Sequence, residues 1–204
     1  MSDMEPTQID PESSAPPEKQ KRGVSIIGIK ISVGAIAAIV GVCALLTLLG
    51  VGMLRNQEGP VTVGETVPNF TLTTFEGEQI SLADLKNKVI ILNFWASWCK
   101  PCEEEAADLE TAWRIYQPGG EVVFLGVDYV DTETEANVYL EKFDITYPNG
   151  PDLRTQISQA FRIRGVPETY IIGKDGKLAA FKISPFLSLA EIQGMIDPLL
   201  EAQN

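Results

Sequence analysis

Apolar residues follow two patterns in this 204-residue chain, one before residue 55 and another after residue 66. Residues 31–54 form an uncharged run, ISVGAIAAIVGVCALLTLLGVGML, which has no polar face. A helix of that length spans about 36 Å, whereas the hydrocarbon core of a membrane is about 30 Å thick. The pattern therefore predicts a transmembrane anchor over residues 24–54, and a buried core helix is the less favoured alternative.

The flanks of this run predict its orientation. Four lysines and arginines lie close before it, and only Arg55 follows it before Lys86. Positive residues stay inside, so we expect a cytoplasmic N-terminus and an exported domain. The run is too long for the core of a signal peptide, and no small-x-small cleavage site follows it, which favours a retained anchor. Cys43 within it is expected to act as a small apolar side chain.

The segments on either side of the anchor have the composition of connecting regions. Residues 1–23 are expected to be a disordered cytoplasmic tail, because they show no apolar periodicity and their first 20 residues include four prolines. Residues 55–66 contain glycine and proline and are expected to be a linker. The remaining residues, 67–204, are long enough to form one domain with its own core.

The pattern of the 67–204 domain alternates between strands and helices. KVIILNFWA and EVVFLGVDYV are continuous apolar runs, typical of strands buried on both faces. PNFTLTTFEGEQISL predicts two short strands around Glu76–Gly77, and ETYIIG with KLAAFKI predicts a hairpin around residues 174–177. Helices are predicted over residues 100–117 and 132–143, at ISQAF, and near the C-terminus, where Pro198 should kink or end the last one. The fold class is α/β, a central sheet flanked by helices.

Charge and composition restrict the classes of partner that this chain is expected to bind. The formal net charge is −12, and the five acidic and five basic residues up to residue 55 cancel, so the exported part carries the whole excess. A domain this acidic repels nucleic acid and anionic lipid, and we expect no nucleic-acid partner. The chain has three cysteines and no histidine.

Two of these cysteines, Cys99 and Cys102, stand in FWASWCKPC, where a buried strand ends and a helix begins. At a helix start, unpaired N–H groups and the helix dipole stabilise a thiolate. Lys100 adds a positive charge beside Cys99, and Pro101 lacks an N–H where the helix has no partner for one. Both features favour a reactive Cys99.

The alternatives to a redox pair are weaker. A structural disulfide this short would close almost no loop and stabilise little. A zinc site would need two further ligands, but the exported part has neither a histidine nor a third cysteine. We expect no metal and no other cofactor. Two inert thiols would be unusual in an oxidising compartment, which leaves a redox-active Cys99–Cys102 pair as the favoured interpretation.

FWASWCKPC resembles the active site of the thioredoxin fold, and residues 164–169, RGVPET, resemble the loop that carries the cis-proline of that family. With the anchor, the chain is similar to the membrane-tethered TlpA/ResA/CcmG-like thiol:disulfide oxidoreductases. The resemblance covers about residues 65–204 and implies a thioredoxin fold, with a central mixed sheet. It also implies an extra helix and strand, for which residues 132–150 have room.

The resemblance also implies roles for single residues. Cys99 would be the exposed nucleophile and Cys102, more buried, would resolve the mixed disulfide. Pro167 would have a cis bond to Val166, whose backbone could pair with a substrate peptide. Trp98 would shield the sulfur, while Trp95 is expected to be simple core.

Acidic residues near the motif supply a second set of expectations. Where thioredoxins carry a buried aspartate this chain has Asn93, which cannot take a proton, and Glu105 matches a glutamate of the tethered branch that could. Ala106 replaces a proline that often kinks this helix. Glu103 and Glu104 are expected only to favour the first helical turn. Glu168 is expected either to tune partner choice or simply to be exposed.

These features predict an anchored enzyme that reduces disulfides of exported proteins. By resemblance, apocytochrome c is the expected client, a membrane thiol transporter is the electron donor, and the anchor contacts the lipid bilayer. A peroxiredoxin is less favoured, because Ala96 and Leu92 stand where that family needs threonine and proline. A copper chaperone would need wider cysteine spacing and a histidine. A redox scaffold that only binds partners remains a further alternative.

Overall fold

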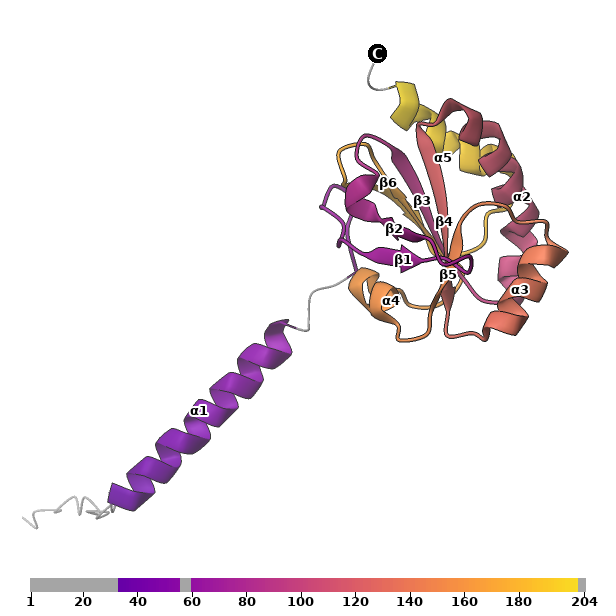
Figure 1. Ribbon diagram of the computed structural model, residues 1–204. Coiled ribbons are helices and arrows are strands. Elements are labelled where there is room, and N and C mark those ends of the chain that lie inside the picture. Colours follow the sequence, from indigo (N-terminus) through magenta and orange to yellow (C-terminus); the bar gives the residue numbers. More distant parts are fainter. Residues whose placement is uncertain (1–32, 56–59, 202–204) are drawn as a thin grey trace, which may run out of the picture. The chain divides into compact units, whose positions relative to one another are not determined.

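The computed structural model describes residues 33–55 and 60–201, which belong to two compact units that divide after residue 56 (Figure 1). In the first unit it describes helix α1 (Val33–Arg55), on which leucines such as Leu45, Leu46 and Leu48 are exposed. Within the described ranges, no helix meets the length and apolarity needed to cross a membrane. The expected tail (1–23), the beginning of the expected anchor (24–32) and residues 56–59 of the expected linker lie outside the described residues.

The second unit alternates strands and helices, as the apolar pattern predicts. Its strands are β1 (Thr71–Thr73), β2 (Gln79–Ser81), β3 (Val89–Trp95), β4 (Val122–Tyr129), β5 (Asn149–Asp152), β6 (Glu168–Ile172) and β7 (Leu178–Lys182). Its helices are α2 (Lys100–Tyr116), α3 (Glu133–Lys142), α4 (Gln156–Phe161) and α5 (Leu189–Glu201), with short 3-10 turns η1 (Leu82–Asp84) and η2 (Gln117–Gly119).

Five strands form a mixed sheet in the order β5-β4-β3-β6-β7. Strand β3 lies in the middle, parallel to β4 and antiparallel to β6, and all seven of its residues are buried. Strands β1 and β2 form a separate antiparallel pair. Helix α3 and strand β5 follow β4 and together are the helix-strand insertion that the resemblance implies.

The two faces of β3 pack against different elements. Ile90, Leu92 and Phe94 join a core with β1 and α4, whereas Val89 and Ile91 join a core with α2 and α5. In Figure 1, α2 and α5 lie side by side, and their residues are in contact. A third cluster contains both cysteines of the motif and connects α2 to α3. The end of β3 and both cysteines therefore lie in the cluster through which α2 contacts α3.

Three boundaries differ from the expectations. Helix α5 continues through Pro198 to Glu201, so of the two expected effects of this proline, a kink or a helix end, the helix end is wrong. The inserted strand lies at Asn149–Asp152, slightly beyond the expected segment, and its sequence NGPD has poor strand formers that an edge strand tolerates. Gly64 N–H donates to the carbonyl of Leu178, so the end of the expected linker already belongs to the folded unit.

Candidate active site

The two cysteines lie where β3 passes into α2. Strand β3 ends at Trp95, and Cys99 is the N-cap residue of α2, with an extended backbone. The backbone N–H of Cys102 donates to Cys99 Sγ at 3.2 Å, so the sulfur takes one of the N–H groups that a helix start leaves unpaired. The two residues form a disulfide, with 5.3 Å between their Cα atoms. The sulfur of Cys99 thus lies at the positive end of the helix dipole.

Burial of the two cysteines differs less than expected. Cys102 is 1% exposed, and Cys99 is 4% exposed in this disulfide form, so the expectation of an exposed Cys99 is wrong for this state. The neighbouring Trp98 is 59% exposed, and its indole N–H donates to the carbonyl of Val130 at 3.3 Å. An exposed aromatic surface therefore lies next to a buried disulfide.

Lys100 and Pro101 occupy the first turn of α2, and both are exposed. Lys100 Nζ contacts Glu103 at 2.5 Å, and this hydrogen bond raises the pKa of Lys100. Glu103 also pairs with Lys142 of α3 at 3.1 Å. The positive charge expected to act on Cys99 is therefore partly compensated by Glu103.

The Val166–Pro167 loop lies against the cysteine cluster. The peptide bond between these two residues is cis, which confirms the expectation from the resemblance. Val166 is partly buried and packs on the cluster that contains Cys99 and Cys102, whereas Pro167 is buried. Strand β6 starts immediately afterwards, at the position that pairs with Phe94 of β3. The central sheet therefore holds this loop in place beside the disulfide.

Glu168 has a different environment from the expected one. Its side chain is 1% exposed, so the alternative of a simply exposed residue is wrong. A role of Glu168 in partner choice stays a prediction. One carboxylate oxygen accepts from the N–H groups of Arg164 and Gly165 at 2.7 and 3.2 Å, and the other accepts from the Tyr170 hydroxyl at 2.9 Å. Glu168 therefore fixes the shape of the loop that precedes Pro167.

Glu105 is buried on α2, one turn beyond Cys102, with 1% of its surface exposed. Its carboxylate accepts from Asn93 Nδ2 at 2.8 Å and from the backbone N–H of Phe186 at 2.9 Å. Burial raises the pKa of Glu105 to about 7, although these two hydrogen bonds favour the charged form. Near neutral pH this carboxyl group can therefore both accept and release a proton.

Asn93 connects Glu105 to the sheet. Its Nδ2 also donates to Thr169 Oγ1 of β6 at 2.9 Å, and Asn93 itself is 3% exposed. The residue that replaces the aspartate of thioredoxins is therefore a donor to the buried acid rather than an acid itself. Compared with thioredoxins, the titratable group therefore lies on α2 instead of β3.

Two further residues at the site, Tyr139 and Asn149, were not singled out from the sequence. Tyr139 of α3 donates its hydroxyl to the carbonyl of Cys102 at 2.8 Å and stacks on Trp95 with 4.4 Å between ring centroids. Trp95 in turn donates to Asn149 of the inserted strand at 2.8 Å, so it does more than fill the core. The periodicity of α3 could have indicated Tyr139, because the buried residue Ala136 precedes it by three positions.

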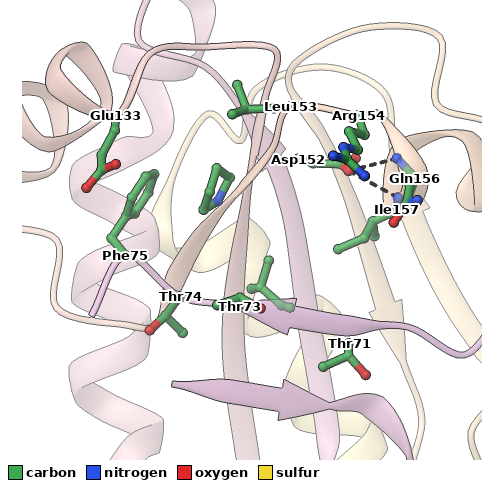
Figure 2. Close-up of a pocket in the computed structure, with 12 residues that line it drawn as sticks. Thr71, Thr73, Thr74, Phe75, Glu133, Asp152, Leu153, Arg154, Gln156 and Ile157 are labelled. Carbon is green, nitrogen blue, oxygen red and sulfur yellow. Dashed lines mark hydrogen bonds between the residues drawn. The ribbon is translucent and has the colours of Figure 1, made fainter. Parts of the chain in front are cut away.

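The hollow in Figure 2 is lined by residues from β1, β5 and the start of α4, and its lining includes neither cysteine. Asp152 in its wall accepts from the backbone N–H groups of Gln156 and Ile157, drawn as dashed lines. Its second oxygen accepts from Ser158. The carboxylate of Asp152 is therefore satisfied by the protein itself.

A cysteine pair at the start of the helix after a central strand, facing a cis-proline loop in a mixed sheet, defines the class of thioredoxin-like dithiol-disulfide proteins. The sequence comparisons agree with that class. Residues 63–181 match the AhpC/TSA family. The chain is 35% identical over 137 residues to the thiol-disulfide oxidoreductase ResA of Geobacillus thermodenitrificans, covering 66% of this chain and 78% of the relative.

Two further likenesses extend the comparison. ResA of Oceanobacillus iheyensis is 27% identical over 192 residues, which cover 92% of this chain and 95% of the relative. A solved thiol:disulfide interchange protein of Chlorobium tepidum superposes with a TM-score of 0.61 at 25% identity, covering 71% of this chain and 99% of its own. The chain belongs to the AhpC/TSA family and, within it, to the ResA-like thiol-disulfide oxidoreductases. Its reaction is dithiol-disulfide exchange with disulfide-bearing proteins.

Proposed function

We propose that this protein reduces disulfides of exported proteins through Cys99 and Cys102. The observation that carries the proposal is the helix start, where Cys99 Sγ accepts the N–H of Cys102 while a titrating carboxyl group lies one turn further along. A sulfur in that position is stabilised as a thiolate, which is the form that attacks a disulfide.

The reaction has two displacement steps. The Cys99 thiolate attacks one sulfur of the partner's disulfide, which forms a mixed disulfide and releases the other partner sulfur as a thiolate. Cys102 then loses its proton and attacks Cys99 Sγ, which forms the Cys99–Cys102 disulfide and releases the second partner thiolate. The partner has gained two electrons, and after protonation it carries two thiols.

Glu105 is the proposed acceptor of the Cys102 proton. It follows Cys102 by one helical turn, and a carboxyl group with a pKa of about 7 exchanges protons readily at neutral pH. Trp98, Val166 and Pro167 are the proposed partner-binding surface. Trp98 is exposed next to the disulfide, and the backbone of Val166 could add the partner peptide as a strand. Lys100 and Pro101 are proposed to support the helix start.

We infer the direction of electron flow from the charges around Cys99. Lys100 and the helix dipole favour the thiolate of Cys99, whereas Glu103 compensates Lys100 and the domain as a whole is acidic. We expect a reducing couple. The reduction potential of the protein, measured against glutathione or dithiothreitol buffers, tests this: a value at or below about −250 mV supports a reductant, and a value near about −120 mV would make it an oxidant.

The membrane anchor over residues 24–54 and the export of the 67–204 domain are also proposed. They rest on the uncharged run of residues 31–54, on the lysines and arginines that precede it, and on exposed leucines of α1 such as Leu45 and Leu46. Carbonate extraction of membranes distinguishes the outcomes. The full chain should stay in the membrane fraction and a chain that starts at residue 57 should not, whereas release of the full chain would overturn the anchor.

The proposed client is apocytochrome c and the proposed donor is a membrane thiol transporter, both from the resemblance to the tethered family. A variant that stalls at the mixed disulfide identifies both in cells, because it leaves a covalent adduct that mass spectrometry can assign. Adducts with cytoplasmic proteins alone would contradict the proposed compartment.

A further inference from the structure

Asp128 is a buried acid that the exchange reaction does not use. It lies near the end of β4, in register with Trp95 of β3, and is 0% exposed. No N–H or O–H group of the residues that the structure describes donates to either carboxylate oxygen. An ionised carboxylate that is buried without a donor is very costly, and such a group takes up a proton instead.

Asp131 lies three residues further on, in the loop after β4, and is 6% exposed. Its Oδ2 accepts from the backbone N–H of Ser97 at 2.6 Å, and its Oδ1 accepts from the N–H of Thr132 at 2.7 Å. Both oxygens therefore receive a donor, which is the environment that an ionised carboxylate prefers.

Ser97 connects this pair of acids to the active site. It lies between Trp95 and Cys99, in the turn where the N–H of Cys99 donates to the carbonyl of Ala96 at 3.1 Å. The hydrogen bond to Asp131 is therefore a fixed point for the segment that presents Cys99 to a partner. A change of charge next to Asp131 therefore acts on the turn that contains Ser97.

We propose that Asp128 holds a proton, donates it in a hydrogen bond to the ionised Asp131, and thereby fixes the Ser97 turn in the geometry that presents Cys99. Asp128 is a positioning residue in this proposal, since it acts through Asp131 and Ser97. The proposal rests on the exchange function proposed above and adds a proton-dependent support for the same site.

The groups that face Asp128 are consistent with this assignment. Its register neighbours are Trp95 on β3 and Pro151 on β5, neither of which titrates. Tyr139 of α3 stacks on Trp95, and burial raises its pKa, so its phenol stays neutral. Burial first, and then the charge of Asp131, raises the pKa of Asp128 to about 8. In the dithiol state a Cys99 thiolate would add one more negative charge beside the same turn.

The sign of the pH effect follows from this raised pKa. The folded protein keeps the proton of Asp128 up to about pH 8, whereas the unfolded chain releases it near the ordinary value of about 4. The contribution of this group to stability is therefore complete below about pH 4 and is lost as the pH rises to about 8. Above that value two buried carboxylates repel each other, and the anchor of the Ser97 turn weakens.

Asp128→Asn tests the proposal in the full chain with Cys43→Ala as the parent, because an amide donates to Asp131 at every pH. The ratio of the Cys99 alkylation rates, variant over parent, should rise several-fold as the pH passes through about 8. The melting temperature of the variant should exceed that of the parent by an amount that grows between about pH 4 and about pH 8. At neutral pH the carbonyl band of protonated acids should be weaker in the variant than in the parent, because the contribution of Asp128 is gone and that of Glu105 remains.

Two further variants make the test specific. Asp84→Asn makes the same substitution at an exposed surface position and should alter none of these three measurements. Asp131→Asn should move the pH step of the alkylation rate to lower pH, because burial of Asp128 remains but the charge of Asp131, which also raises its pKa, is gone. A flat rate ratio for Asp128→Asn, or a protonated-acid band of equal intensity in Asp128→Asn and the parent, would overturn the proposal. Alkylation and infrared spectra need no client, so the exchange function can fail separately.

Discussion

Strand β3 divides its seven residues between two faces that serve different purposes. Toward β1 and α4 it presents Ile90, Leu92 and Phe94, which are apolar and fully packed. Toward α2 its last two inward residues are Asn93 and Trp95, each of which makes a buried hydrogen bond. On the first face, burial of apolar side chains stabilises the fold but places no polar group where it could take part in a reaction. The second face accepts buried polar groups, and the cysteines, Glu105 and Asp128 gather around it.

The largest effect that separates the two faces is expected from Phe94→Ala. Phe94 is 0% exposed, and its ring lies 5.7 Å from those of Phe161 and Tyr170. Removing it leaves a cavity and should lower the free energy of unfolding by about 3–5 kcal/mol. Denaturant titration measures this loss. The alkylation rate of Cys99 at low temperature should stay near that of the parent, and a matching loss of reactivity would mean that the faces are not independent.

Glu105→Gln is expected to have the next largest effect, this time on the rate. Without a titrating carboxyl group, resolution by Cys102 should slow by on the order of 10²-fold near neutral pH. Stopped-flow measurement of partner release as a function of pH tests this. The matched control is Glu104→Gln, an exposed residue of the same helical turn, which should leave the rate unchanged. A pH profile that is identical in parent and Glu105→Gln would make Glu105 a structural residue.

The same variant should change how stability depends on pH. The pKa of Glu105 is raised from 4.5 to about 7 by folding, so its contribution is complete below about pH 4.5 and is lost as the pH rises to about 7. Glutamine does not titrate. The stability of Glu105→Gln relative to the parent should therefore increase across that interval, as measured by chemical unfolding at several pH values.

Tyr139→Phe is expected to have the smallest effect, about 1 kcal/mol of stability, because it removes one buried hydrogen bond to the Cys102 carbonyl and keeps the ring on Trp95. Thermal unfolding measures it. Tyr129→Phe is the control, since the Tyr129 hydroxyl has no hydrogen bond within the described part of the chain. Equal losses of stability in the two variants would mean that the hydrogen bond from Tyr139 of α3 to Cys102 has no special role.

Sequence periodicity predicts the apolar face of β3 well and the polar face only in part. Continuous apolar runs such as KVIILNFWA are typical of buried strands and predict β3. The apolar stripe of Ala106, Leu109 and Trp113 predicts helix α2, which follows β3. Strand β5 escapes prediction because NGPD carries no apolar signal and is held by its neighbour β4.

At the site, the positions of Cys99, Cys102 and the Val166–Pro167 bond follow from motifs whose chemistry is local. The surroundings of Glu168 could not be predicted, because its partners are backbone N–H groups and the Tyr170 hydroxyl. Tertiary contacts alone bring Asp131 to Ser97, which lies 34 residues away in sequence. Sequence patterns predict which residues react, and packing decides which residues support them.

The most direct test of the account is trapping of mixed disulfides by two serine variants in the Cys43→Ala chain. Cys102→Ser should accumulate covalent adducts with disulfide-bearing proteins, because Cys99 attacks and nothing resolves the product. Cys99→Ser should accumulate none. Adducts in equal amounts from both variants, counted on non-reducing gels, would contradict the assignment of Cys99 as the nucleophile at the start of α2.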